Sequence, residues 1–100
     1  MYGQIRLTYV IRVQLRDEPP ADYHRLHELM EEYGCTRIID TETGRFHLPD
    51  AEYCLQTAVP ITTVRDDVLR IASREDVAEQ GNPRVLVMEV RNWSFELDPV

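Results

Sequence analysis

The alternation of apolar and polar residues at the start of the chain is its strongest pattern. The apolar positions share one parity and are Ile5, Leu7, Tyr9, Ile11, Val13 and Leu15. Successive side chains of a β-strand point to opposite faces of its sheet. The pattern therefore predicts a strand over Ile5–Arg16, with one apolar face against the core and one open face that carries Arg6, Arg12 and Arg16.

A helix is predicted next, from about Ala21 to Tyr33. Consecutive prolines at 19 and 20 end the strand and suit a first helical turn, where a missing N–H costs nothing. Helical spacing then predicts a buried stripe of Tyr23, Leu26, Leu29, Met30 and Tyr33. Gly34 follows where a helix commonly ends in a left-handed residue.

Shorter patterns predict the remaining elements. A strand over Thr36–Asp40 is followed by a turn at Gly44, a return over Arg45–Leu48, and a third main strand over Glu52–Val59 that Pro60 ends. A second helix over about Val64–Arg74 begins at a capping-box-like pair, Thr63 and Asp66, and the acidic run Ser73–Gln80 extends or frays it. The last strand begins at Arg84, and its register slips near Asn92 through a bulge or bend.

The order βαββαβ predicts an α+β fold of the ferredoxin-like type. We expect a four-stranded antiparallel sheet with both helices on one face, and the first and third main strands at its centre. One hundred residues suffice for a single domain, residues 1–100. No apolar run is long enough to cross a bilayer and no signal-peptide pattern is present, which favours a cytoplasmic protein.

Charge and cysteine content narrow the classes of function. The net charge is −7, which repels nucleic acid at long range, yet every basic residue is arginine, which suits phosphate recognition. A GC-rich genome would give the same excess of arginine. Cys35 and Cys54 are too few for a disulfide framework or zinc site and are expected as buried thiols. No metal site and no cofactor are expected, because no ligand cluster or phosphate-cradling glycine loop occurs.

The open face of the first strand is the first candidate site. RNA-recognition domains stack bases on such a face, but this parity lacks the aromatic residues for stacking, which leaves phosphate contacts by Arg6, Arg12 and Arg16. The alternative is that Arg6 or Arg12 pairs with Glu89 on the last strand.

His24, Arg25 and His27 on the first helix are the second candidate site. RNA cleavage without a metal needs a base for the 2′-hydroxyl, an acid for the leaving oxygen, and positive charge at the phosphorus. Two histidines and an arginine can supply all three. Alternatively, these side chains pair with Glu28 and Glu31. His47 is expected to face solvent.

Trp93, Phe95 and Leu97 form an apolar set near the end of the chain. Such a segment folds back over the core or docks on a partner. Pairing with the sheet edge of a second copy would give a two-fold homodimer.

A set of short motifs adds a family resemblance over roughly residues 8 to 75. The motifs are Thr8-Tyr9-Val10, Arg25-Leu26, Leu29-Met30, Gly44 followed by Leu48 and Tyr53, Thr62-Thr63, and Leu69-Arg70. In them the chain resembles the GhoS-type antitoxins, small ferredoxin-like proteins similar to CRISPR-associated endoribonuclease folds. The resemblance implies a sequence-selective endoribonuclease that cleaves the transcript of a small membrane toxin. The resemblance implies a functional role for Arg25. The chain departs from the family at two positions: His27 stands where the family has a second arginine, and Gln14 lies near the position of an acidic residue.

Two functions therefore stay open. The first is an RNA-binding, antitoxin-like protein that can act as a metal-independent endoribonuclease. The second is a non-enzymatic module, a small regulator or phage-type inhibitor whose acidic surface binds a protein. The net charge favours the second and the family pattern favours the first.

Overall fold

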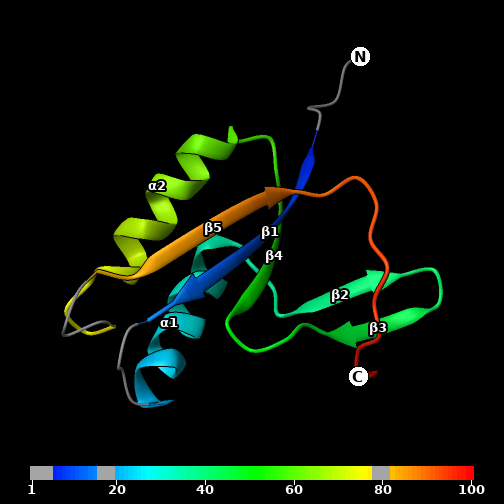
Figure 1. The fold of residues 1–100 in the computed structure, drawn as a ribbon, viewed down its shortest axis with the longest axis horizontal. Coiled ribbons are helices and arrows are strands. Elements are labelled where there is room, and N and C mark those ends of the chain that lie inside the picture. The colour runs from blue at the N-terminus through cyan, green and yellow to red at the C-terminus, as the bar shows by residue number, and fades with distance from the viewer. Residues whose placement is uncertain (1–5, 16–19, 78–81) are drawn as a thin grey trace.

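The chain folds into two helices and five strands, as seen in a computed structural model that describes residues 6–15, 20–77 and 82–100 (Figure 1). In chain order the elements are β1 (Leu7–Gln14), α1 (Pro20–Tyr33), β2 (Ile38–Thr41), β3 (Gly44–His47), β4 (Glu52–Thr57), α2 (Ile61–Ala72) and β5 (Arg84–Glu89). The α+β class predicted from the sequence is confirmed.

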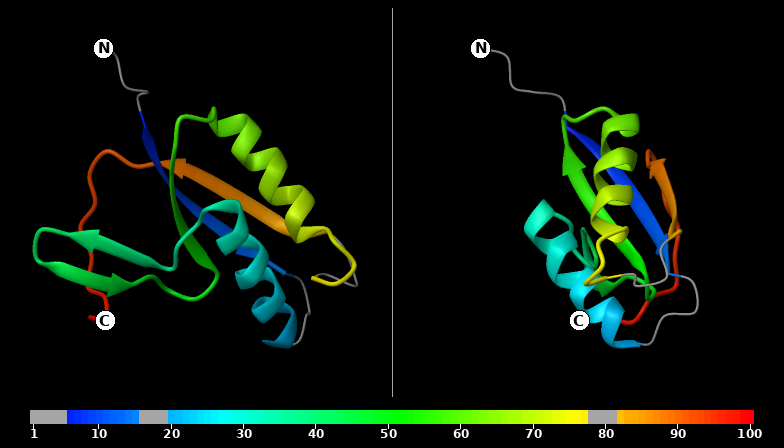
Figure 2. Two further views of the ribbon diagram at one scale, coloured as in Figure 1. Left: turned by 180° about the vertical axis from the view of Figure 1, so that it is seen from behind. Right: turned by 90° about the vertical axis from the view of Figure 1, so that its left-hand side faces the viewer.

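β1 is the central strand of the main sheet, which has the order β4-β1-β5 with antiparallel neighbours. Both helices lie on one side of this sheet, as the view from behind shows (Figure 2). The prediction of a four-stranded sheet is wrong. β2 and β3 form a separate two-stranded hairpin that projects from the main sheet.

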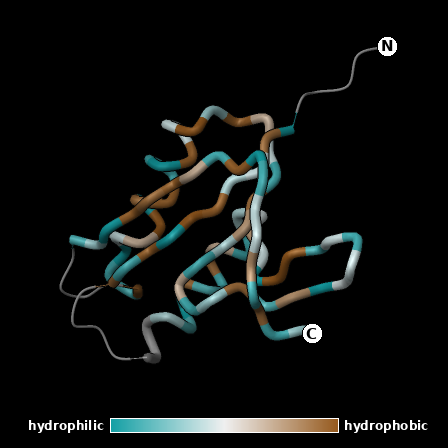
Figure 3. The backbone as a smooth tube through the Cα atoms, turned by 45° about the vertical axis from the view of Figure 1, so that its right-hand side comes forward, coloured by the Kyte–Doolittle hydropathy of each residue, from teal (hydrophilic) through white to brown (hydrophobic). Residues whose placement is uncertain are grey.

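The parity predicted for the first strand is confirmed. Tyr9, Ile11 and Val13 are fully buried against both helices, and Leu15 joins them in the same core. Val10 points to the opposite face and is nevertheless buried, because Cys54 of β4 and Met88 of β5 lie directly across from it. In Figure 3 hydrophobic positions follow the strands across the middle of the molecule, while the turn of the β2–β3 hairpin is hydrophilic.

A bend at Arg37, directly after Thr36, separates the hairpin from the main sheet. The N–H and C=O of Thr36 both bond to Cys54 of β4 at 2.8 Å, which begins the pairing that the sequence predicted. The Thr36 hydroxyl then donates to the carbonyl of Ile38 at 2.8 Å. Such a local side-chain bond competes with a strand ladder, and the chain turns away to pair with β3 instead.

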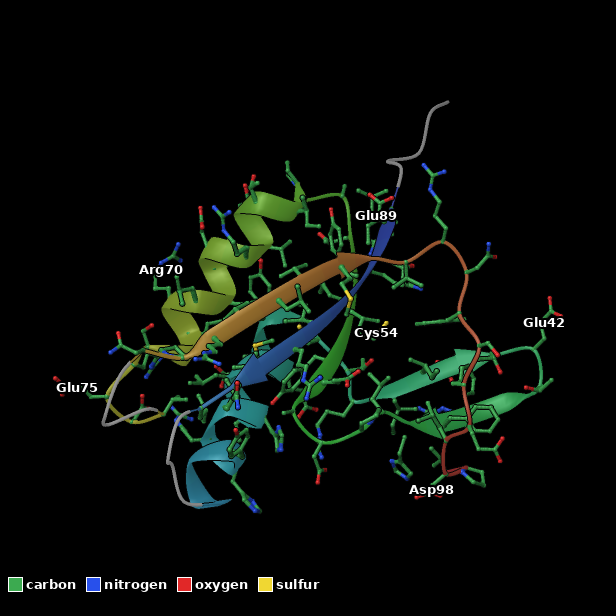
Figure 4. The ribbon with its side chains drawn as sticks, in the orientation of Figure 1. Glu42, Cys54, Arg70, Glu75, Glu89 and Asp98 are labelled. Atoms are coloured by element: carbon green, nitrogen blue, oxygen red, sulfur yellow. The ribbon has the colours of Figure 1, made fainter. Side chains whose placement is uncertain are left out.

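The last residues of the chain run along β3. The N–H of His47 donates to the carbonyl of Asp98, and the N–H of Val100 donates to Arg45. Figure 4 places Asp98 beside β3 accordingly. Phe95 packs edge-on against Phe46 with ring centroids 5.1 Å apart. The tail therefore has an intramolecular partner, and the expected register slip is replaced by an end of β5 at Glu89.

The end of α1 agrees with prediction, but the start of α2 does not. Gly34 has φ of 113°, its N–H donates to Glu31, and the N–H of Cys35 donates to Met30, as in a Schellman motif. α2 begins three residues early, after Pro60, whose extended backbone leads directly into the helix. The predicted capping box of Thr63 and Asp66 is therefore wrong, since both residues lie inside the helix.

Two further expectations concern the cysteines and membrane-spanning segments. Cys35 and Cys54 are buried free thiols, as predicted, and burial raises the pKa of Cys35 to about 12. Neither helix in the part of the chain that the structure describes is long and apolar enough to cross a membrane.

A pair of substitutions tests the parity of β1. Ile11→Ala should lower the free energy of unfolding by about 2–5 kcal/mol, because it leaves a cavity beneath both helices. Arg12→Ala, on the open face of the same strand, should change it by no more than about 0.5 kcal/mol. Urea denaturation of the two variants measures both values, and equal losses would contradict the arrangement.

Candidate functional site

α1 brings His24 and His27 to the surface beside β4. Leu26 and Met30 are buried in the core and fix the helix against the sheet, so the histidines lie next to that buried stripe. His24 is exposed and His27 is half-buried. Their ring centroids are 6.5 Å apart, as expected for neighbours on one helical surface.

Tyr53 of β4 holds the His27 ring. Its hydroxyl lies 2.5 Å from Nδ1 of His27, and the phenol is almost completely buried. Burial raises the pKa of Tyr53, so the phenol keeps its proton. Donation of this proton to Nδ1 leaves the imidazole proton on Nε2. The reverse arrangement, with Nδ1–H donating, leaves the phenol proton without a partner among the described residues, which favours the first tautomer.

The pKa of His27 lies below its ordinary value of 6.5. Burial is the largest cause, and the positive charges of Arg37 and His24 add to it. The imidazole is therefore neutral near pH 7. Between the lowered pKa and 6.5, the unfolded chain binds more protons at this histidine than the folded chain does. The free energy of unfolding therefore decreases as the pH falls through that window.

Two hollows meet at His27. The inner hollow, about 350 Å³, lies between α1, β4 and the hairpin and is lined by His27, Tyr53, Arg37, Arg45 and Asp40 among others. The outer hollow, about 750 Å³, lies on the other side of His27 and includes His24, Glu28 and Asp50. His27, Glu31 and Arg37 line both hollows and form the wall between them.

The arginines of these hollows already have acidic partners. Arg37 lies 3.6 Å from Asp50, and Arg45 lies 2.8 Å from Asp40. Both pairs are largely exposed, and such pairs contribute little to stability, about 0–1 kcal/mol. An anionic ligand can therefore replace Asp50 or Asp40 as the partner of these arginines with little loss of stability.

Arg25 lies apart from the two histidines. Its Nε donates to Asp76 at 2.8 Å and its Nη1 to Glu28 at 3.4 Å, and it lines neither hollow. These bonds raise the pKa of Arg25, and those from Arg25 and Arg74 lower the pKa of Asp76. Arg25 thus links α1 to the segment after α2, and the predicted group of His24, Arg25 and His27 does not share one concave site.

The open face of the main sheet collects a second set of arginines. Arg6 and Arg12 point away from the helices, as predicted, while Arg16 lies outside the described residues. Arg84, which lies opposite Gln14 in the register of β5, joins them. The strands place one carboxylate on this face, Glu52, directly across from Arg12.

The predicted pairing of Arg6 or Arg12 with Glu89 is wrong. Glu89 lies opposite Tyr9, on the helix side of the sheet, and its nearest cation is Arg91 at 3.9 Å. Figure 4 places Glu89 at the far end of β5. The parity of β5 explains the error, because odd-numbered residues of both strands face the helices.

Ion pairing divides the arginines into two groups. Those paired with a carboxylate are Arg25, Arg37, Arg45, Arg65, Arg70, Arg74 and Arg91. Within the ranges 6–15, 20–77 and 82–100, Arg6, Arg12 and Arg84 have no such pair, and all three belong to the open face. In an acidic protein, this face therefore carries the available positive charge.

Trp93 supplies an aromatic residue to the same face. It lines a groove of about 340 Å³ together with Arg6, Thr8, Cys54 and Gln56, and its side chain is 40% exposed. We call this the sheet groove. The sequence pattern missed it because Trp93 lies beyond β5 and reaches the face through the path of the tail. Thr36, Ile38 and Asp40 line both the sheet groove and the inner hollow, and thus form the ridge between them.

The remaining candidates carry less chemistry. His47 of β3 is exposed, as expected, and its backbone bonds to the tail. Among the residues that the structure describes, no cluster of three His, Cys, Asp or Glu side chains could hold a metal ion. Sequence reasoning missed Arg37 and Tyr53 as partners of His27, because only the packing of α1 on β4 brings them together.

Comparison of the chain with protein-family models, with curated proteins and with solved structures found no match.

The tautomer of His27 gives a prediction for its titration. Tyr53→Phe removes the hydroxyl that donates to neutral Nδ1, so the pKa of His27 should rise toward 6.5. NMR titration of the His27 ring protons in the wild type and in Tyr53→Phe measures the shift. A fall in the pKa would mean that Nδ1–H is the donor.

Proposed function

We propose that the protein binds single-stranded RNA along the open face of its main sheet. The observation that carries the proposal is the gathering of Arg6, Arg12 and Arg84 on this face while the other described arginines are ion-paired. Guanidinium groups that have no carboxylate partner among the described residues are available for phosphate oxygens.

An exposed aromatic side chain on the face supports a single-stranded ligand. Trp93 offers an indole surface on which a base can stack. We infer a ferredoxin-like arrangement in which one face of the sheet is covered by helices, the other is open, and the second strand has swung out with its hairpin.

The resemblance to GhoS-type antitoxins makes the transcript of a small membrane toxin the first RNA to test. The alternative of an acidic module that binds a protein is the outcome if no RNA is bound. The net charge of −7 favours this alternative, because it repels RNA at long range. RNA binding would then depend on the local contacts of the open face.

Cleavage of the bound RNA is a second candidate, and the hollows around His27 favour it. His24, His27 and Arg37 line the outer hollow. The inner hollow and the ridge of Thr36, Ile38 and Asp40 lie between it and the sheet groove. In the favoured tautomer Nε2–H of His27 donates to a phosphate oxygen rather than accepting a proton. His24 would then take the proton of the 2′-hydroxyl, water would supply a proton to the leaving 5′-oxygen, and Arg37 would offset the charge of the phosphorane.

The binding proposal predicts a shallow salt dependence that depends on the open-face arginines. Three phosphate contacts should give a slope of log K against log salt of about −2, because each contact on a single strand contributes about −0.7. Arg12→Gln with Arg84→Gln should reduce the slope to about −0.7. Fluorescence anisotropy of a labelled oligoribonucleotide measures it, and the quenching of Trp93, the sole tryptophan, reports stacking.

The matched control is Arg70→Gln with Arg74→Gln, which removes the same charge from ion-paired arginines in α2 and just after it. This double variant should bind almost as the wild type does. Equal losses in both double variants would mean that total charge, not the open face, governs binding. Absence of binding at low salt would favour the protein-binding alternative.

The cleavage proposal predicts that activity depends on the hollows and not on Arg25. Total RNA incubated with the wild type in EDTA should be cut, and His24→Gln, His27→Gln and Arg37→Gln should each reduce the rate at least about tenfold. Arg25→Gln should retain the rate, because its side chain lies on Asp76. Gel analysis measures the products. Loss of cleavage in Arg25→Gln alone would support the original assignment from the family pattern.

A further inference from the structure

The outer edge of β5 is unpaired in the part of the chain that the structure describes. Val90 donates to Thr8 of β1, and the even-numbered residues of β5 continue this ladder inward. In an antiparallel pair the alternate residues point their N–H and C=O groups to the other side. Val85, Val87 and Glu89 therefore present three N–H and three C=O groups outward, with no backbone partner among the described residues.

Between Arg84 and Glu89, this edge lacks the usual protection against pairing. Exposed edges commonly carry proline, lysine, a bulge or inward-pointing charge. β5 is instead regular from Arg84 to Glu89 and apolar between these ends. Leu86 is 52% exposed and Met88 is 41% exposed on the open face. Ile61 of α2 is also exposed and lines a hollow with Val85 and Val87.

We propose that this edge pairs with β5 of a second copy of the chain across a two-fold axis at Val87, which joins two three-stranded sheets into one. This register places Val87 opposite Val87 and Val85 opposite Glu89, so that every outward group of the three residues is bonded. A register centred on Leu86 would set Glu89 opposite Pro83, which has no N–H to donate.

The side chains of the two faces fit the same register. On the open face Leu86 of each copy lies opposite Met88 of the other, which covers both exposed side chains. On the helix face Glu89 of the second copy comes to Val85, beside the hollow that Arg65 lines. Arg65 is exposed, and among the described residues its ion pair is with its neighbour Asp66. The register thus brings opposite charges together across the axis.

The charge and apolar content of the edge select a second copy over other partners. Arg65 and Glu89 are both supplied by this chain, and each interface contains the pair twice because of the symmetry. The tail that carries Trp93, Phe95 and Leu97 is already paired with β3. β5 is therefore a better site than the tail for the homodimer that the sequence suggested.

Sedimentation at micromolar concentration tests the proposal. The wild type should be a dimer. Val87→Pro removes a donor that β1 does not use, and Met88→Lys places a charge opposite Leu86, so each should give a folded monomer with an unchanged circular dichroism spectrum. Leu69→Lys is the control. It charges an apolar residue of α2 that is as exposed as Met88, and this variant should stay dimeric.

A disulfide tests the register without relying on weakened variants. Residues 86 and 88 of the two copies would form a non-hydrogen-bonded pair with Cα atoms about 4.5 Å apart, within the range for a disulfide. A mixture of Leu86→Cys and Met88→Cys proteins should therefore give a linked dimer on mild oxidation, and each protein alone should give far less. Cys35 and Cys54 are buried and do not compete.

A monomeric wild type would overturn the proposal. So would a dimer that keeps its mass in Val87→Pro and Met88→Lys, or one that is lost when the chain ends before Asn92, since that result would place the interface in the tail. Crosslinking of Leu86→Cys with itself in preference to the mixture would overturn the register. Loss of the dimer in Val87→Pro and Met88→Lys alone, with the mixed disulfide, supports it.

Discussion

The burial of one face of β1 is the constraint on which the rest of the structure depends. Tyr9, Ile11 and Val13 are completely buried beneath both helices, and β1 is the strand that joins β4 to β5. A shift of one residue in its register would turn these side chains to solvent and bring arginines under the helices. Removing that apolar surface from water therefore fixes at once the centre of the sheet, the side that the helices cover, and the side on which Arg6 and Arg12 remain.

The candidate sites follow from what the packing of this layer leaves uncovered. α1 must bury Leu26 and Met30 on β1 and β4, and this places His27 against the buried hydroxyl of Tyr53. The bend after Thr36 then carries the hairpin away from β4, so that hollows remain on both sides of the segment from Thr36 to Asp40. Had β2 continued along β4 from the Thr36–Cys54 bridge, it would have occupied the edge of the sheet beside Glu52.

Ion pairing decides which arginines are available to contact an anionic ligand. Arg25 and Arg74 converge on Asp76, Arg37 lies beside Asp50 of the loop before β4, and Arg45 lies beside Asp40 of β2. The chain has many carboxylates, so a guanidinium remains without one only where strand parity places few of them. The open face meets this condition, since Glu52 is the carboxylate that its strands contribute. RNA binding and dimerisation through β5 would thus use adjoining parts of one surface.

The sequence by itself determined the local elements whose signals lie within a few residues. The alternation in β1 predicted its faces, the spacing in α1 predicted the buried stripe, and Gly34 predicted the helix end, because each depends on side-chain direction or backbone freedom at that position. The tertiary structure alone decided the rest: that β2 leaves the sheet, that Arg25 bonds to Asp76, that Tyr53 holds His27, and that Trp93 reaches the open face. These contacts join residues far apart in the chain, where competing partners are close in energy and the geometry of the whole fold selects one.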